Sequence, residues 1–197
     1  MTEELKRLIS KIQDYNSEAD FKLIEKAYDF AQIAHAGQKR LSGDPFFIHP
    51  LAVANILADY KLDTVSIAAG LLHDTVEDSA VSKEEIEKEF GSSVIEIVSG
   101  VTKIGEISLR GSSEETFVEN LRRMLLAMSK DLRVILVRLA DRYHNMQTLH
   151  HLPQEKRIKT AKETLEVYAP LAERLGMGEM KGNLEDLSFP YVYPEEY

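Results

Sequence analysis

The feature that limits the fold of this chain most strongly is a predicted helix with one imidazole and three carboxylates on a single face. The segment 64–78 is rich in helix-forming residues, and its polar positions are His73, Asp74, Glu77 and Asp78. At roughly 100° per residue, these four side chains fall on one arc of about 140°. The opposite side is apolar, so we expect this helix to pack against a core and to point its polar arc at a site.

A bound cation would explain the arc, provided that the chain supplies further ligands. Carboxylates crowded on one face cost free energy unless a cation compensates their charge. Gly70 lies near the middle of the arc, one turn earlier, and we expect its missing side chain to leave room for a ligand. Acidic helix faces are usually just solvated, however, so the interpretation depends on ligands from other segments.

The segment 43–50 supplies a second histidine. Gly-Asp-Pro at 43–45 is a turn signal, and Pro50 suits the first position of the helix that follows. His49 precedes that proline, which restricts its backbone. We therefore expect His49 to be held at the start of a helix.

The segment 131–148 supplies a further carboxylate. Its core-facing stripe begins with apolar residues and then turns polar, in the order Val134, Val137, Asp141, Asn145 and Thr148. A buried stripe that turns polar faces something polar inside the protein. The alternative for Asp141 is a buried salt bridge to Arg138 or Arg142.

Together these segments give a candidate ligand set of His49, His73, Asp74 and Asp141. Nitrogen and oxygen ligands without a thiolate suit Mn²⁺, Mg²⁺, Fe²⁺ or Zn²⁺. The order H…HD…D resembles the signature of the HD phosphohydrolase superfamily. That resemblance implies an all-α fold, the helical bundle of an HD domain.

A closer resemblance is to the hydrolase domain of the bifunctional Rel/SpoT alarmone enzymes, and it runs from about residue 20 to the C-terminus. The HDxxED motif at 73–78 is one part of it. The other matching segments are 35–50, 100–103, 139–149 and 163–176. An HD pair alone is a weak signal, whereas this ordered set of motifs is highly specific.

The resemblance implies a manganese-dependent 3′-pyrophosphohydrolase. Such an enzyme converts (p)ppGpp, the guanosine tetra- or pentaphosphate, into GDP or GTP and pyrophosphate. The Mn²⁺ would be held by the four candidate ligands, and Glu77 and Asp78 would orient and deprotonate a water. The alternative for Glu77 and Asp78 is support of the ligands or a simple salt bridge.

The same resemblance places the nucleotide. Arg40 and Ser42 precede His49 in the loop that holds the guanine base in this family, and a guanidinium plane stacks well on a purine. Asn145 and Thr148 share the face of the metal-binding aspartate and would hydrogen-bond the nucleotide. Leu41 departs from many relatives, which have a basic or polar residue there; this puts affinity or guanine selectivity in question, not the reaction.

The remaining histidines receive lesser roles. We place His35 near the site as a hydrogen-bonding residue. We expect His144, His150 and His151 to be structural or surface residues, because nothing in the pattern assigns them as ligands.

Composition limits the other function classes. The net charge of −9 argues against direct, broad nucleic-acid binding. The absence of cysteine excludes disulfides and thiolate metal sites. No long apolar run or signal-like N-terminus occurs, so we expect a cytoplasmic protein without a membrane span. Two alternatives stay open: another HD nucleotide phosphohydrolase, and a non-catalytic regulatory HD domain.

The chain reads as nearly all helix. We expect helices near 1–14, 19–38, 50–60, 64–78, 82–90, 92–100, 114–129, 132–149, 153–174 and 179–187. The stretch 103–113 reads as a loop, with Ser112 and Glu115 as a capping box for the helix that follows. We expect one HD-type hydrolase domain over 1–197. Its aromatic, proline-broken end, 189–197, would start a linker to a synthetase domain that this chain lacks.

Overall fold

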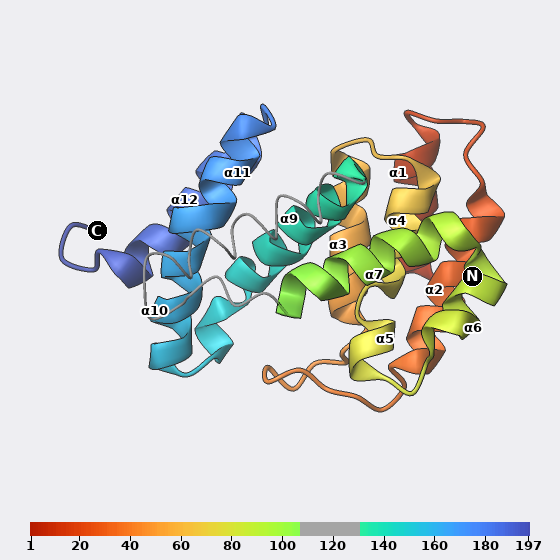
Figure 1. Ribbon diagram of the computed structural model, residues 1–197, viewed down its shortest axis with the longest axis horizontal. Coiled ribbons are helices and arrows are strands. Elements are labelled where there is room, and N and C mark those ends of the chain that lie inside the picture. Colours follow the sequence, from red (N-terminus) through yellow and green to blue (C-terminus); the bar gives the residue numbers. More distant parts are fainter. Residues whose placement is uncertain (107–130) are drawn as a thin grey trace.

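Figure 1 shows a computed structural model of the chain, which describes residues 1–106 and 131–197. These residues form helices, and an isolated bridge between Lys39 and Pro45 is the only strand-like pairing among them. The all-α prediction is confirmed. The elements are α1 (Glu3–Gln13), α2 (Phe21–Ala34), α3 (Ile48–Asp59), α4 (Thr64–Leu72), α5 (Thr75–Asp78), α6 (Lys83–Phe90), α7 (Ser92–Glu106), α9 (Leu132–Gln147), η1 (Leu149–His151), α10 (Gln154–Glu163), η2 (Thr164–Tyr168), α11 (Ala169–Arg174) and α12 (Gly178–Val192).

Helix α4 is the centre of the N-terminal part. Every residue from Ser66 to Leu72 is buried, and the helix packs against α2, α3, α7 and α9. Asp63 caps its start by accepting a hydrogen bond from the backbone N–H of Ser66 at 2.8 Å. An apolar helix surrounded on all sides in this way is a rigid support for the residues at its end.

Gly70 does not leave room for a ligand, so that expectation is wrong. A Cβ built on Gly70 would lie 2.5 Å from Cδ1 of Leu57. The glycine therefore allows α3 and α4 to approach each other closely, and the space beside it is filled by α3. This close approach fixes the distance between the helix that carries His49 and the helix that precedes His73.

The single helix predicted over 64–78 is two elements. Helix α4 ends at Leu72, and the short α5 begins at Thr75. Two carbonyls of the last turn of α4 accept hydrogen bonds from side chains: Gly70 O from His73 Nδ1 at 2.8 Å, and Leu72 O from Thr75 Oγ1 at 2.7 Å. Because side chains occupy these carbonyls, the backbone ladder is interrupted there.

Helix α9 joins the two halves of the molecule. It packs on α3, α4 and α7 on one side and on α12 on the other, and Figure 1 shows it crossing between the N-terminal helices and the group α10 to α12. Its stripe is buried at Val134, Val137 and Asp141. The polar part of that stripe is thus buried at Asp141, as the sequence predicts, and only half-buried at Asn145 and Thr148.

Several predicted boundaries differ from the structure. Helix α7 runs to Glu106, so the first part of the loop predicted over 103–113 is helical. The predicted capping box at Ser112 and the helix predicted over 114–129 lie outside the described residues. The helix predicted over 153–174 contains a π-helical turn, η2. Among the described helices, none combines the length and apolar character needed to cross a membrane.

The helix predicted to end at 187 continues to Val192, through Pro190. A proline in the last turn forfeits only its own backbone hydrogen bond, so the cost is small there. Tyr191 and Val192 pack against the core, which supports the extra turn. Tyr197 is exposed.

Candidate metal centre

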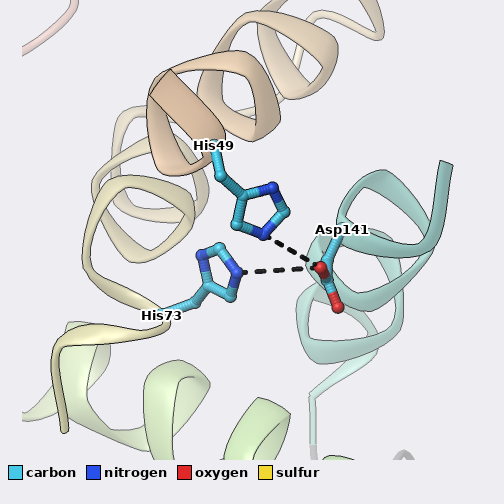
Figure 2. A group of neighbouring side chains, drawn as sticks. All are labelled: His49, His73 and Asp141. Carbon is cyan, nitrogen blue, oxygen red and sulfur yellow. Dashed lines mark ion pairs between the residues drawn. The ribbon is translucent and has the colours of Figure 1, made fainter. Parts of the chain in front are cut away.

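Three segments that are distant in sequence meet at one buried cluster. His49 comes from the start of α3, His73 follows α4, and Asp141 lies in the middle of α9, as Figure 2 shows. One ligand atom from each of these three residues lies within 4.8 Å of the other two, and all three residues are buried. The cluster is a buried His/His/Asp metal-binding group.

Asp74 lies beside the same group. Its Oδ1 is 3.1 Å from Nε2 of His73, and its Oδ2 is 3.4 Å from Nε2 of His49. Asp141 approaches the same two nitrogens through a single atom: its Oδ1 is 3.2 Å from Nε2 of His49 and 3.9 Å from Nε2 of His73. The structure therefore brings together the four residues that the sequence singles out as ligands.

The proton of neutral His73 lies away from this cluster. Nδ1 of His73 is 2.8 Å from the carbonyl oxygen of Gly70, and a carbonyl can only accept a hydrogen bond. Nδ1 therefore carries the proton. The Nε2 atom keeps its lone pair, and it points at the two aspartates.

The contacts of His49 likewise show which of its ring nitrogens carries the proton. Its Nδ1 lies 2.7 Å from Nδ1 of His144, which is also 3.3 Å from Nη1 of Arg40. Because a guanidinium only donates, Nδ1 of His144 accepts, and Nδ1 of His49 must be the second donor. Burial, with the charge of Arg40 added to it, lowers the pKa of His144 to about 4, so His144 is neutral near pH 7. In neutral His49, Nε2 therefore also presents a lone pair to the aspartates.

These assignments leave four acceptors facing one another. With both imidazoles in their neutral forms, two lone pairs and two carboxylates converge at 3.1 to 3.9 Å without a proton between them. Such an arrangement is repulsive unless a cation lies among them. Ligand atoms bound about 2.1 Å from an ion are about 3.0 Å apart at a right angle and about 3.4 Å apart at the tetrahedral angle. The donor set and its spacing fit a divalent transition-metal ion.

Asp141 is held from both sides. Its Oδ2 accepts a hydrogen bond from Nη1 of Arg138 at 2.6 Å, and its Oδ1 accepts one from Nδ2 of Asn145 at 2.6 Å. Burial alone would raise the pKa of Asp141, but neighbouring positive charge, Arg138 foremost, outweighs burial and holds the pKa well below its usual range. The buried salt bridge considered as an alternative reading is present with Arg138, and it coexists with the metal-binding group.

Glu77 and Asp78 lie on α5, directly after the cluster residues His73 and Asp74. Burial raises the pKa of each carboxyl, and the charge of Asp74 adds to the rise. Nε2 of Gln38 donates to the carbonyl oxygen of Asp78 at 2.6 Å. His35 lies next to this contact, with Nδ1 2.8 Å from Oε1 of Gln38. The end of α5 is thus tied to the loop between α2 and α3.

The residues predicted to bind a nucleotide line one cavity of about 620 Å³. Arg40, Ser42, Asn145 and Thr148 are among its walls, and the cavity reaches Asp141. Arg40 sits on a tight turn: its backbone N–H donates to Asp44 O at 2.9 Å and its carbonyl accepts from Gly43 N at 2.9 Å. Gly43 has φ +90°, a conformation that favours glycine. The turn holds Arg40 in the wall of the cavity that also reaches the metal-binding group.

Two further residues of α9 contact the cluster: Arg138, which the sequence offered as a salt-bridge partner of Asp141, and His144, to which the sequence pattern assigned no site role. His144 is buried against His49, and Arg138 binds Asp141. Both stand three positions from Asp141 on α9, so they share its helix face. That spacing was the available signal. His150 and His151 are exposed, but His151 also lines the cavity, where the sequence pattern assigned it no role.

Comparison with known proteins places this geometry in a family. The family model described as "HD domain" matches residues 27–178. A solved structure described as a metazoan ortholog of SpoT that hydrolyzes ppGpp superposes with a TM-score of 0.59, at 24% identity, over 88% of this chain and 95% of that chain. At that level of identity, the likeness concerns the fold.

Curated relatives are much more similar in sequence. A GTP pyrophosphokinase of Myxococcus xanthus is 50% identical over 188 residues, which cover 94% of this chain and 25% of the relative. A protein of Vibrio cholerae named guanosine-3′,5′-bis(diphosphate) 3′-pyrophosphohydrolase is 48% identical over 185 residues, which cover 94% of this chain and 26% of the relative. The chain spans about a quarter of the length of these relatives.

Proposed function

This chain belongs to the HD-domain family, and from that premise we propose that it hydrolyses the 3′ pyrophosphate of guanosine tetra- or pentaphosphate, (p)ppGpp. The products are GDP or GTP and pyrophosphate. One observation carries the proposal: the buried group of His49, His73 and Asp141 adjoins a cavity of about 620 Å³ through Asp141, which also lines that cavity, and a cavity of this volume is of the size that small-molecule sites have. The Vibrio cholerae relative, named for this reaction, supports the choice of substrate.

The charge around the cavity supports a polyanionic substrate. The whole chain has a net charge of −9. Most of the charged residues that line the cavity are nevertheless cationic. Its cationic walls are Lys39, Arg40, Arg138, Arg142, Lys156 and Lys159, and its acidic ones are Asp141 and Glu163. Basic walls that converge in a concave site attract and hold phosphate groups.

The metal we propose is Mn²⁺. Two imidazole nitrogens disfavour Mg²⁺, which prefers nearly all-oxygen shells, and they suit a borderline ion. A divalent ion bound at the cluster would polarise the 3′ phosphate and acidify a water. The residues that would hold it are His49, His73, Asp74 and Asp141.

Glu77 and Asp78 are the candidate general bases. Their raised pKa values make them stronger bases than ordinary carboxylates. A base of this kind takes the proton of the attacking water, which contributes about 10²–10⁴-fold to the rate. The short helix α5 places both carboxyls directly after the ligands His73 and Asp74.

Arg40 is the candidate contact for the guanine base. The edge of its guanidinium is engaged by His144 and Asn145, so its flat faces are what it can offer to a purine. Ser42 lies on the same turn and Thr148 on the facing wall, where both would hydrogen-bond the nucleotide. Leu41 is also at the cavity and exposed, and it would supply an apolar contact.

The experiment is a substrate panel with product identification. The purified chain with Mn²⁺ is incubated separately with ppGpp, pppGpp, GTP and dGTP. We expect pyrophosphate with GDP from ppGpp and with GTP from pppGpp, and no turnover of the two triphosphates. Hydrolysis of dGTP instead would assign the chain to another class of HD nucleotide hydrolase, and turnover of none would favour a regulatory domain.

A further inference from the structure

Arg40 contacts two residues, and each of those contacts a different member of the metal-binding group. Nη1 of Arg40 lies 3.3 Å from Nδ1 of His144, which in turn is 2.7 Å from Nδ1 of His49. Nη2 of Arg40 donates at 3.0 Å to Oδ1 of Asn145, whose Nδ2 donates at 2.6 Å to Oδ1 of Asp141. One guanidinium therefore reaches two candidate ligands through one intermediate residue each.

The first of these paths selects the form of His49 that can bind a metal. With Arg40 donating to it, Nδ1 of His144 must accept, so His49 carries its proton on Nδ1 and keeps the Nε2 lone pair. Without Arg40, His144 can instead donate to Nδ1 of His49. The proton of His49 then moves to Nε2, where it would bond to the aspartates at 3.2 and 3.4 Å. That arrangement satisfies the cluster without a metal ion.

The second path orients the amide of Asn145. Because its Oδ1 accepts from Arg40, its Nδ2 points at Asp141. Without Arg40, Oδ1 of Asn145 loses its donor, and the amide is held only by its bond to Asp141. Loss of Arg40 thus removes one polar support from each side of the candidate metal site.

We propose that Arg40 is a positioning residue for the metal-binding group, and that through it nucleoside binding and metal binding strengthen each other. The inference rests on the proposed function for its assignment of guanine to Arg40. A base stacked on the guanidinium face immobilises the side chain in its donating position, so less ordering remains for the metal to impose. By thermodynamic linkage, the metal raises nucleoside affinity by the same factor.

Coulomb's law makes the opposite prediction for the simplest variant. Arg40→Met removes a positive charge near a cation site, so charge alone would make the metal bind more tightly. The positioning role predicts weaker binding, by about 10–100-fold, which is usual for residues that orient metal ligands. Arg40→Lys keeps the charge but cannot donate to both partners in one plane, and it should also bind metal more weakly.

The test is a titration of the metal-free protein with Mn²⁺, in which electron paramagnetic resonance measures the free ion. Guanosine is the nucleoside, because it has no phosphate to coordinate the ion. In the wild type, we expect guanosine to raise Mn²⁺ affinity about 5-fold or more. In Arg40→Met and in His144→Phe, we expect weaker Mn²⁺ binding and a smaller effect of guanosine. His150→Phe is the control, because His150 is exposed and lies outside the cavity.

The outcomes separate this inference from the proposed function. Circular dichroism of the metal-free variants checks that each is folded; Arg40 is only partly buried, so Arg40→Met keeps the test decisive if His144→Phe misfolds. Unchanged or tighter Mn²⁺ binding in Arg40→Met would overturn the inference, whether or not the enzyme hydrolyses ppGpp. A weakened site in a protein that leaves ppGpp intact would support the positioning role and refute the proposed substrate.

Discussion

At the scale of single residues, the position of the protons decides what this cluster can bind. Gly70 O fixes the proton of His73 on Nδ1, and the contact with His144 does the same for His49. Sequence motifs indicated His49, His73, Asp74 and Asp141, because HD patterns carry them. They could not indicate His144 or Arg40 as partners of the ligands, since those contacts join residues about a hundred positions apart.

Substitutions should distinguish the residues that bind the metal from those that act as the general base. His73→Ala should lose Mn²⁺ binding and activity together. Glu77→Gln or Asp78→Asn should retain the metal and lose about 10²–10⁴-fold in kcat, because only the proton transfer is impaired. Metal content and steady-state rates measure the two effects, with Glu84→Gln on α6 as the control. If neither carboxyl variant slows the reaction, the base lies elsewhere.

The pKa of Glu77 and of Asp78 should depend on Asp74. Burial and the charge of Asp74 raise both pKa values, so Asp74→Asn should lower them towards their ordinary values in the metal-free protein. Carboxyl carbon NMR over a pH series measures this. A raised native pKa means that the folded state binds more protons, so these two groups make stability fall as pH rises from the ordinary pKa towards the raised one. Unchanged titrations in Asp74→Asn would show that burial alone sets the pKa.

At the scale of helices, periodicity predicts which segments are helical but not where they are interrupted. The break between α4 and α5 depends on hydrogen bonds from His73 and Thr75 side chains to backbone carbonyls. The continuation of α12 past Pro190 depends on packing of Tyr191 and Val192. The α4–α5 break and the extended end of α12 both depend on contacts that local helix propensity does not take into account.

Gly70 should be needed for the contact between α3 and α4. Gly70→Ala places a Cβ 2.5 Å from Cδ1 of Leu57, so we expect a loss of about 1–3 kcal/mol in the free energy of unfolding from overpacking. Urea denaturation of the metal-free protein measures it. Gly182→Ala on α12 is the matched control, because no atom lies within 4 Å of its added Cβ, and it should stabilise by up to about 1 kcal/mol. A Gly70→Ala variant as stable as the wild type would show that Leu57 moves aside freely.

At the scale of the molecule, the candidate metal site joins three helical segments. His49, His73 and Asp141 come from α3, the end of α4 and α9, so their convergence exists only in the folded state. No single segment of the sequence carries it, and only the resemblance to a known family could place the three together in advance.

Metal binding should therefore stabilise the whole fold. A ligand that binds only the native state at about 100 times its Kd adds about 2.7 kcal/mol to the free energy of unfolding. We expect Mn²⁺ to raise the Tm of the wild type relative to the chelated protein and to have little effect on Asp141→Asn. Asp59→Asn is the control, since Asp59 forms an exposed ion pair with Lys11. An equal rise of Tm in Asp141→Asn would place the bound ion at another site.

The central claim is that the cluster of His49, His73, Asp74 and Asp141 holds the ion that drives hydrolysis of the 3′ pyrophosphate. The most direct measurement is pyrophosphate release from ppGpp by the chelated protein before and after Mn²⁺ is restored, in the wild type and in Asp141→Asn. We expect no release without metal, full release after Mn²⁺ is added to the wild type, a smaller recovery with Mg²⁺, and none in Asp141→Asn. Release at the full rate from the metal-stripped wild type, or from Asp141→Asn, would contradict the account.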